Sequence, residues 1–119
     1  MGRVLIVDDN SDVRKSLAAL FELEGHTAKT AANGREAMQS LQTDVRPDLI
    51  VLDLMMPTLD GLSFLEMMRK HPVWEKVRVV IYTGYDHGVD SVRLRELGVG
   101  EIMLKGAIDV TRLIKLINC

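Results

Sequence analysis

Short apolar runs alternate with stretches of helical periodicity five times along the chain. Three of the runs, Arg3–Val7, Leu49–Asp53 and Val77–Tyr82, are almost continuously apolar up to their last residues, and two further short segments, a weak one at 26–30 and another at 101–104, continue the alternation. Strands that are continuously apolar, rather than alternating apolar and polar residues, are typical of a parallel sheet covered by helices on both faces. The pattern therefore predicts five strands, with the run at 26–30 as a weak edge strand.

Each predicted strand is followed by a segment with the apolar spacing of an amphipathic helix. In the first of these, Val13, Leu17, Leu20 and Phe21 recur at intervals that place them on one face of a helix. Similar segments follow at 33–41, from 58 or 60 to a stop at proline 72, at 89–97 and at 110–117. Asn10 or Ser11 and Asn33 are suited to cap the first two helices, and Gly25 is suited to end the first. Five strand–helix units predict an α/β protein with a (βα)5 doubly wound, five-stranded parallel sheet.

Composition limits the classes of function more than it selects one. The chain has 119 residues, 47% of them apolar, and a formal net charge of −2, which fits one globular domain spanning 1–119 with no output domain. This charge favours neither nucleic acid nor a membrane surface as a direct partner. No apolar stretch approaches the ~20 residues that span a bilayer, and no signal peptide opens the chain. Its single cysteine, Cys119, excludes an internal disulfide and favours a reducing cytoplasm.

Reactive side chains occur where the predicted strands end. Asp8 and Asp9 follow the first strand, Asp53 closes the third, Thr83 follows the fourth and Lys105 the fifth. In doubly wound sheets ligands bind outside the carboxyl ends of the strands, so these residues are expected to meet at one edge of the sheet.

Three carboxylates at one edge predict a divalent cation. Holding them together without a cation is costly, and a set of oxygen ligands favours a hard ion such as Mg²⁺. A carboxylate beside such an ion is a plausible nucleophile towards phosphorus, with Thr83 and Lys105 placed to contact phosphoryl oxygens. Asp8 and Asp9 taken singly would be ordinary helix-capping acids. Val13 and Ala19 occupy positions where a calcium-binding loop needs glycine and glutamate, so that motif does not match.

These residues together resemble one family. Asp8-Asp9, the segment from Leu52-Asp53 through Met55-Met56-Pro57 to Asp60-Gly61, Tyr82-Thr83-Gly84 and Leu104-Lys105 are similar, in order and spacing, to the receiver domain of two-component response regulators. The resemblance covers essentially the whole chain and implies the flavodoxin-like receiver fold.

The resemblance implies a role for each residue of the predicted site. Asp53 would accept a phosphoryl group from a phosphohistidine on a sensor histidine kinase or a histidine phosphotransfer protein. Mg²⁺ would be held by Asp9, Asp53 and the backbone carbonyl of Met55, with Asp8 acting mainly through water. Thr83 would be the switch hydroxyl and Lys105 the phosphate contact. Phosphorylation would change binding of a downstream protein partner or fused output domain, through the face at 89–117.

The sequence departs from the family pattern at positions that bear on the switch. Ile102 stands where the family commonly has Tyr or Phe, and Gly106 follows the lysine where proline is usual. Met55 and Tyr85 are neither acids nor amides that would orient an attacking water, so slow self-dephosphorylation is predicted. Two alternatives stay open: a receiver-like interaction module that does not use phosphate, and, less favoured, a Mg²⁺-dependent phosphohydrolase.

Overall fold

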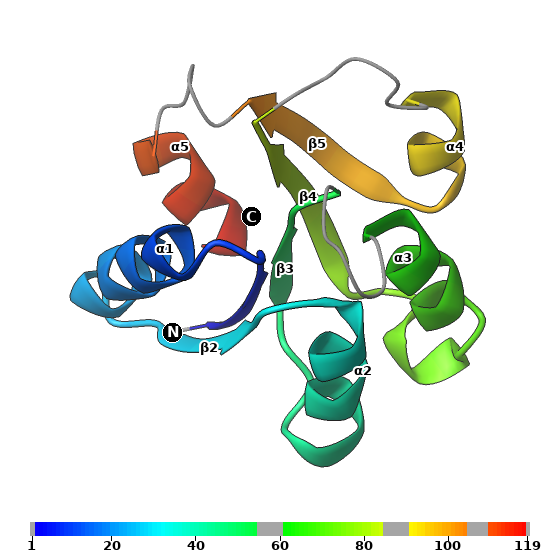
Figure 1. The fold of residues 1–119 in the computed structure, drawn as a ribbon, viewed down its shortest axis with the longest axis horizontal. Coiled ribbons are helices and arrows are strands. Elements are labelled where there is room, and N and C mark those ends of the chain that lie inside the picture. The colour runs from blue at the N-terminus through cyan, green and yellow to red at the C-terminus, as the bar shows by residue number, and fades with distance from the viewer. Residues whose placement is uncertain (1, 55–60, 85–90, 105–109, 119) are drawn as a thin grey trace.

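The computed structural model describes residues 2–54, 61–84, 91–104 and 110–118. Within them, five parallel strands form one sheet in the order β2-β1-β3-β4-β5 (Figure 1). The strands are β1 (Arg3–Val7), β2 (Thr27–Ala31), β3 (Leu49–Leu52), β4 (Arg78–Thr83) and β5 (Val99–Leu104). The predicted doubly wound parallel sheet is confirmed, and β2 lies at an edge as predicted.

Helices cover both faces of this sheet, with α1 and α5 on one side and α2, α3 and α4 on the other (Figure 1). Their bounds are α1 (Ser11–Leu23), α2 (Gly34–Thr43), α3 (Gly61–Arg69), α4 (Ser91–Glu96) and α5 (Val110–Lys115), with short 3₁₀ turns η1 (Pro72–Trp74) and η3 (Leu116–Asn118). None of the helices in the described part of the chain has the length and apolar character needed to cross a membrane.

The central strands are apolar along most of their length because both of their faces are buried there. In β1, Val4 and Ile6 face the core beneath α1 and α5, whereas Leu5 and Val7 face the core beneath α2, α3 and α4. In β3, Leu49 and Ile50 begin the same alternation between the two cores. Successive side chains on a strand point to opposite faces, so a strand between two helix layers must be apolar at every position.

The starts of α1 and α2 and the end of α1 follow the predicted capping residues. The Asn10 side chain accepts hydrogen bonds from the amides of the first turn of α1, and Asn33 accepts one from Glu36 N at 2.9 Å. After α1 the chain reverses at Gly25, whose φ of 87° lies in the left-handed region that favours glycine. One predicted boundary differs: α3 ends at Arg69, and Pro72 begins η1 rather than closing the helix.

The fifth strand is longer than its apolar run. It begins at Val99 rather than at residue 101, and a register shift between Val79 and Val80 accommodates the additional residues against β4. Gly100 and Glu101 interrupt the apolar pattern because β5 is the second edge of the sheet. Backbone pairing with β4 therefore sets the start of β5, which the hydrophobic pattern alone did not indicate.

Candidate functional site

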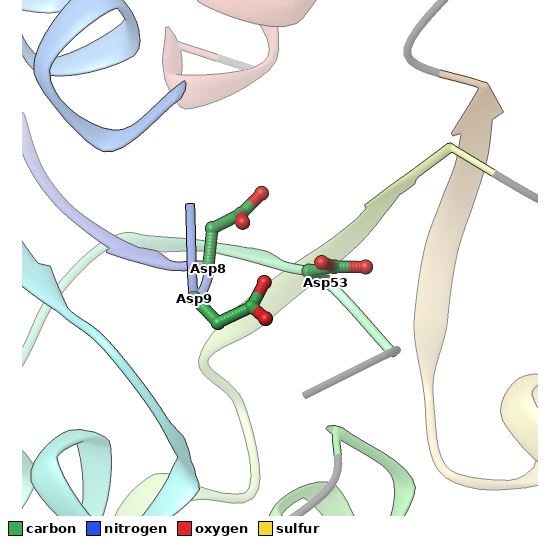
Figure 2. A group of neighbouring side chains, drawn as sticks. All are labelled: Asp8, Asp9 and Asp53. Atoms are coloured by element: carbon green, nitrogen blue, oxygen red, sulfur yellow. The ribbon is translucent and has the colours of Figure 1, made fainter. Parts of the chain in front are cut away.

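Three aspartates from two neighbouring strands meet at the carboxyl edge of the sheet. Asp8 and Asp9 follow β1 and Asp53 follows β3, and these strands are paired in register from Val4–Leu49 to Val7–Leu52. One carboxylate oxygen from each residue lies within 4.8 Å of the other two (Figure 2). Asp8 and Asp53 are only 2% and 4% exposed, whereas Asp9 is open to solvent. The predicted acidic cluster therefore forms, with one accessible side.

The loop that carries Asp8 is held by hydrogen bonds on several sides. The backbone amide of Asp8 donates to the Ala31 carbonyl at 3.1 Å, and Asp8 Oδ1 accepts from the Asn10 amide at 2.8 Å. Asn10 in turn caps α1 through bonds of 2.9 and 3.1 Å from Asp12 N and Val13 N. The short β1–α1 connection is thus tied both to the neighbouring strand and to the helix that follows it.

Asp53 is placed by close backbone packing. Its amide donates to the Val7 carbonyl at 2.9 Å, which extends the β1–β3 ladder by one residue beyond the strand. Gly61, the first residue of α3, packs directly on the same backbone, and its amide donates to the Leu54 carbonyl at 3.3 Å. In the sequence, Gly61 is marked only by its position just after the predicted helix start at 58 or 60. The structure shows that a side chain at this position would collide with the backbone of Asp53 and Leu54.

The remaining predicted site residues are placed less fully. Thr83 ends β4, next to β3 in the sheet, and its backbone pairs in register with Leu104 at the end of β5. Lys105, which follows Leu104 in the sequence, and Met55 lie outside the described residues, as do Tyr85 and Gly106. The structure therefore brings together Asp8, Asp9 and Asp53 and places the backbone of Thr83 at the same edge.

One contact at this edge was not predicted from the sequence. The Arg14 side chain, from the first turns of α1, donates a hydrogen bond of 2.8 Å to the backbone carbonyl of Asp8. In the sequence, Arg14 looks like an ordinary polar residue at the border of the apolar face of a helix. No sequence pattern indicates that its side chain reaches back to the preceding loop.

Ile102, where the family commonly has an aromatic residue, is partly buried. It packs against the core beneath α2, α3 and α4, together with Leu54, the residue that follows Asp53. Its strand neighbour in β4 is Ile81. In this structure the position thus contributes aliphatic packing to the core beneath α2, α3 and α4.

The donor set of the acidic cluster fits a hard divalent cation. Among the residues that the structure describes, the three donors gathered here are carboxylate oxygens, with no sulfur or imidazole beside them. Mg²⁺ is usually bound by one or two carboxylates together with water, and an open side such as that at Asp9 leaves room for water and a further oxygen ligand. Carboxylates this close repel one another unless a cation or proton offsets them.

Comparison with known proteins agrees with this geometry. The family model described as the response regulator receiver domain matches residues 4–118. The chain belongs to this family. It is a receiver domain of the kind found in two-component response regulators, as the sequence resemblance predicted.

Related proteins and structures extend the comparison. The chain is 40% identical over 103 residues to the transcriptional regulatory protein PrrA of Mycobacterium tuberculosis, covering 87% of this chain and 43% of PrrA. A response regulator receiver protein from Pseudomonas putida superposes with a TM-score of 0.90 at 28% identity, covering 98% of this chain and 95% of that one. The response regulator TrrA of Thermotoga maritima, solved in complex with Mg²⁺-BeF, superposes with a TM-score of 0.83 at 27% identity, covering 99% of this chain and 97% of TrrA. The chain spans less than half the length of PrrA.

Proposed function

We propose that Asp53 is the phosphoacceptor of this receiver domain and that its phosphorylation requires Mg²⁺. The observation that carries the proposal is the convergence of Asp53 with Asp8 and Asp9, whose carboxylate oxygens lie within 4.8 Å of one another at the carboxyl edge of the sheet. Ligands bind at this edge in doubly wound sheets. The TrrA structure, solved with Mg²⁺-BeF, lends further support because it has the same fold.

In the proposed reaction a carboxylate oxygen of Asp53 attacks the phosphorus of a phosphohistidine on a partner. An O–P bond forms, the N–P bond of the donor breaks, and the electron pair of that bond stays on the imidazole nitrogen, which is then protonated. Burial of Asp53 and its backbone bond to Val7 keep the nucleophile in one place, which lowers the entropy lost on reaching the transition state.

Asp8, Asp9, Asp53 and the backbone carbonyl of Met55 would hold the Mg²⁺, with Asp8 acting mainly through water. When bound, the ion would neutralise charge on the phosphoryl oxygens. Thr83 is proposed to donate a hydrogen bond to one phosphoryl oxygen and Lys105 to pair with another. These assignments rest on the strand ends at which the residues lie and on the family resemblance.

Phosphorylation is proposed to shift an equilibrium between two conformations and so to change binding of a downstream protein or a fused output domain. A sensor histidine kinase or a histidine phosphotransfer protein would supply the phosphoryl group. Slow self-dephosphorylation, a cytoplasmic location and one receiver domain over 1–119 stay predictions from the sequence. The gathering of the carboxylates favours phosphate chemistry over a phosphate-independent interaction module.

Intact-mass spectrometry after incubation with acetyl phosphate, with and without Mg²⁺, tests the proposal. The wild type should gain the mass of one phosphoryl group only with Mg²⁺, and Asp53→Asn should gain none. Asp12→Asn is a matched control, because it removes a nearby exposed carboxylate outside the cluster. A phosphoryl group retained in Asp53→Asn would overturn the assignment. Continuous phosphate release from a small phosphomonoester would instead favour the phosphohydrolase.

A further inference from the structure

Arg14 links the start of α1 to the peptide that joins two residues of the acidic cluster. Its Nη1 donates to the Asp8 carbonyl oxygen at 2.8 Å, and its own amide donates to the Asn10 carbonyl at 3.1 Å. The guanidinium therefore closes a loop from the helix back to the residue that follows β1. The side chain is half-buried, whereas its neighbour Lys15 on the same helix is exposed.

The carbonyl that Arg14 holds belongs to the Asp8–Asp9 peptide. A peptide group is planar, so the direction of its oxygen sets the direction in which the chain continues to Asp9. The amide of Asp8, on the other side of the residue, is already bonded to Ala31 of β2. With the amide held by the sheet and the carbonyl held by Arg14, little rotation is left at Asp8. The exposed carboxylate of Asp9 therefore follows a peptide whose orientation is held by these two bonds.

We propose that Arg14 is a positioning residue that preorganises the divalent-cation site by holding the Asp8–Asp9 peptide. The inference rests on the proposed function, since it concerns the site at which Mg²⁺ would bind. Groups that orient metal ligands without touching the metal typically change metal affinity by about 10–100-fold when they are removed. Arg14 acts through a backbone carbonyl, so a value at the lower end, about 10-fold, is expected.

The direction in which Mg²⁺ affinity changes when Arg14 is replaced distinguishes a positioning role from the effect of its charge alone. A cation beside three carboxylates repels an incoming divalent cation, so removal of its charge alone would tighten Mg²⁺ binding. Loss of a positioning hydrogen bond would weaken it, because the free protein would then have to order the Asp8–Asp9 peptide when the ion binds. The two explanations predict opposite changes in the same measured affinity.

The experiment is a calorimetric Mg²⁺ titration of the wild type, Arg14→Met, Arg14→Lys and Lys15→Met. Arg14→Met keeps the aliphatic stem and removes the donors and the charge, and Lys15→Met removes the same charge from the neighbouring exposed position. We expect Arg14→Met to bind Mg²⁺ about 10-fold more weakly, Arg14→Lys to recover most of the loss, and Lys15→Met to bind at least as tightly as the wild type. Urea unfolding of each variant shows whether the fold is intact.

An unchanged or tighter affinity in folded Arg14→Met would overturn the inference, as would an equal weakening in Lys15→Met. Failure of the wild type to bind Mg²⁺ would instead overturn the proposed function, so the two failures are distinguishable. If Arg14→Met does not fold, nitrogen NMR relaxation of Arg14 Nε in the wild type provides the second measurement. A guanidinium as rigid as the backbone is expected, and one that moves freely would overturn the inference.

Discussion

Gly61 and Asp53 are in backbone contact at the edge of the sheet. A Cβ atom added to Gly61 would lie 2.5 Å from the backbone oxygen of Asp53 and 2.8 Å from Cα of Leu54. Real Cβ atoms are almost never found this close to other atoms, and both neighbours are backbone, which cannot move aside as the end of a side chain can. The N-terminus of α3 can therefore pack on the site only if residue 61 is glycine.

Gly61→Ala should damage both stability and phosphorylation. The added methyl group must push α3 away from β3 or displace Asp53, and overpacking of this kind costs about 1–3 kcal/mol of unfolding free energy. We expect a lower urea midpoint and a slower gain of the phosphoryl group from acetyl phosphate. Gly100→Ala is the matched control, since its Cβ would lie 3.7 Å from the Val79 carbonyl, an ordinary contact distance. Equal behaviour of the two variants would contradict the packing argument.

Asp9→Asn should make the metal-free protein more stable and remove its response to Mg²⁺. The substitution relieves repulsion among carboxylates within 4.8 Å of one another, which is worth about 1 kcal/mol per pair at the dielectric constant of water and more near a protein surface. A ligand that binds only the folded state raises its stability, so the wild type should gain stability as Mg²⁺ is added. Urea unfolding with and without Mg²⁺ measures both effects.

Asp12→Asn serves as the control for that experiment. Asp12 is an exposed acid in the first turn of α1, and it lies outside the cluster. Its neutralisation should change stability by less than about 0.5 kcal/mol and leave the Mg²⁺ response unchanged. A metal-free Asp9→Asn protein that is less stable than the wild type would show that the carboxylates do not oppose one another as argued.

Arg69→Met should destabilise the protein without changing the site. The Arg69 guanidinium, at the end of α3, donates to the Leu97 carbonyl at 2.7 Å and to the Trp74 and Glu75 carbonyls at 2.9 Å. It thereby ties α3 to η1 and to the end of α4. Hydrogen bonds to a charged group contribute more than neutral ones, and we expect a loss of about 2–3 kcal/mol in urea unfolding.

The control for Arg69 is Lys70→Met, which removes one charge from the next, exposed residue and should be nearly neutral. Burial lowers the pKa of Arg69, but a guanidinium stays protonated in proteins. The loss in Arg69→Met should therefore not vary between about pH 6 and pH 9. Arg69→Met is also expected to bind Mg²⁺ with the same affinity as the wild type. A changed affinity would mean that Arg69 influences the acidic cluster.

The sequence alone was enough to predict the fold class and the acidic cluster. Residues 4–7 and 49–52 are apolar at every position because both faces of the strands are buried, so the parallel, doubly covered sheet could be predicted from composition along the strands. Once the sheet is parallel, residues that follow its strands must lie at one edge. Asp8, Asp9 and Asp53 could therefore be brought together before any distance was known.

Strand limits, close packing and side-chain reach depended on tertiary structure. The start of β5 at Val99 depends on pairing with β4 across a register shift, which local hydrophobicity does not record. The need for glycine at 61 arises from the approach of α3 to the segment that follows β3. The bond from Arg14 to the Asp8 carbonyl arises because a helix side chain reaches back to the loop before the helix. Periodicity reports which face of an element is buried, because burial repeats along the chain. Contacts between particular atoms do not repeat, so only the packed structure decided them.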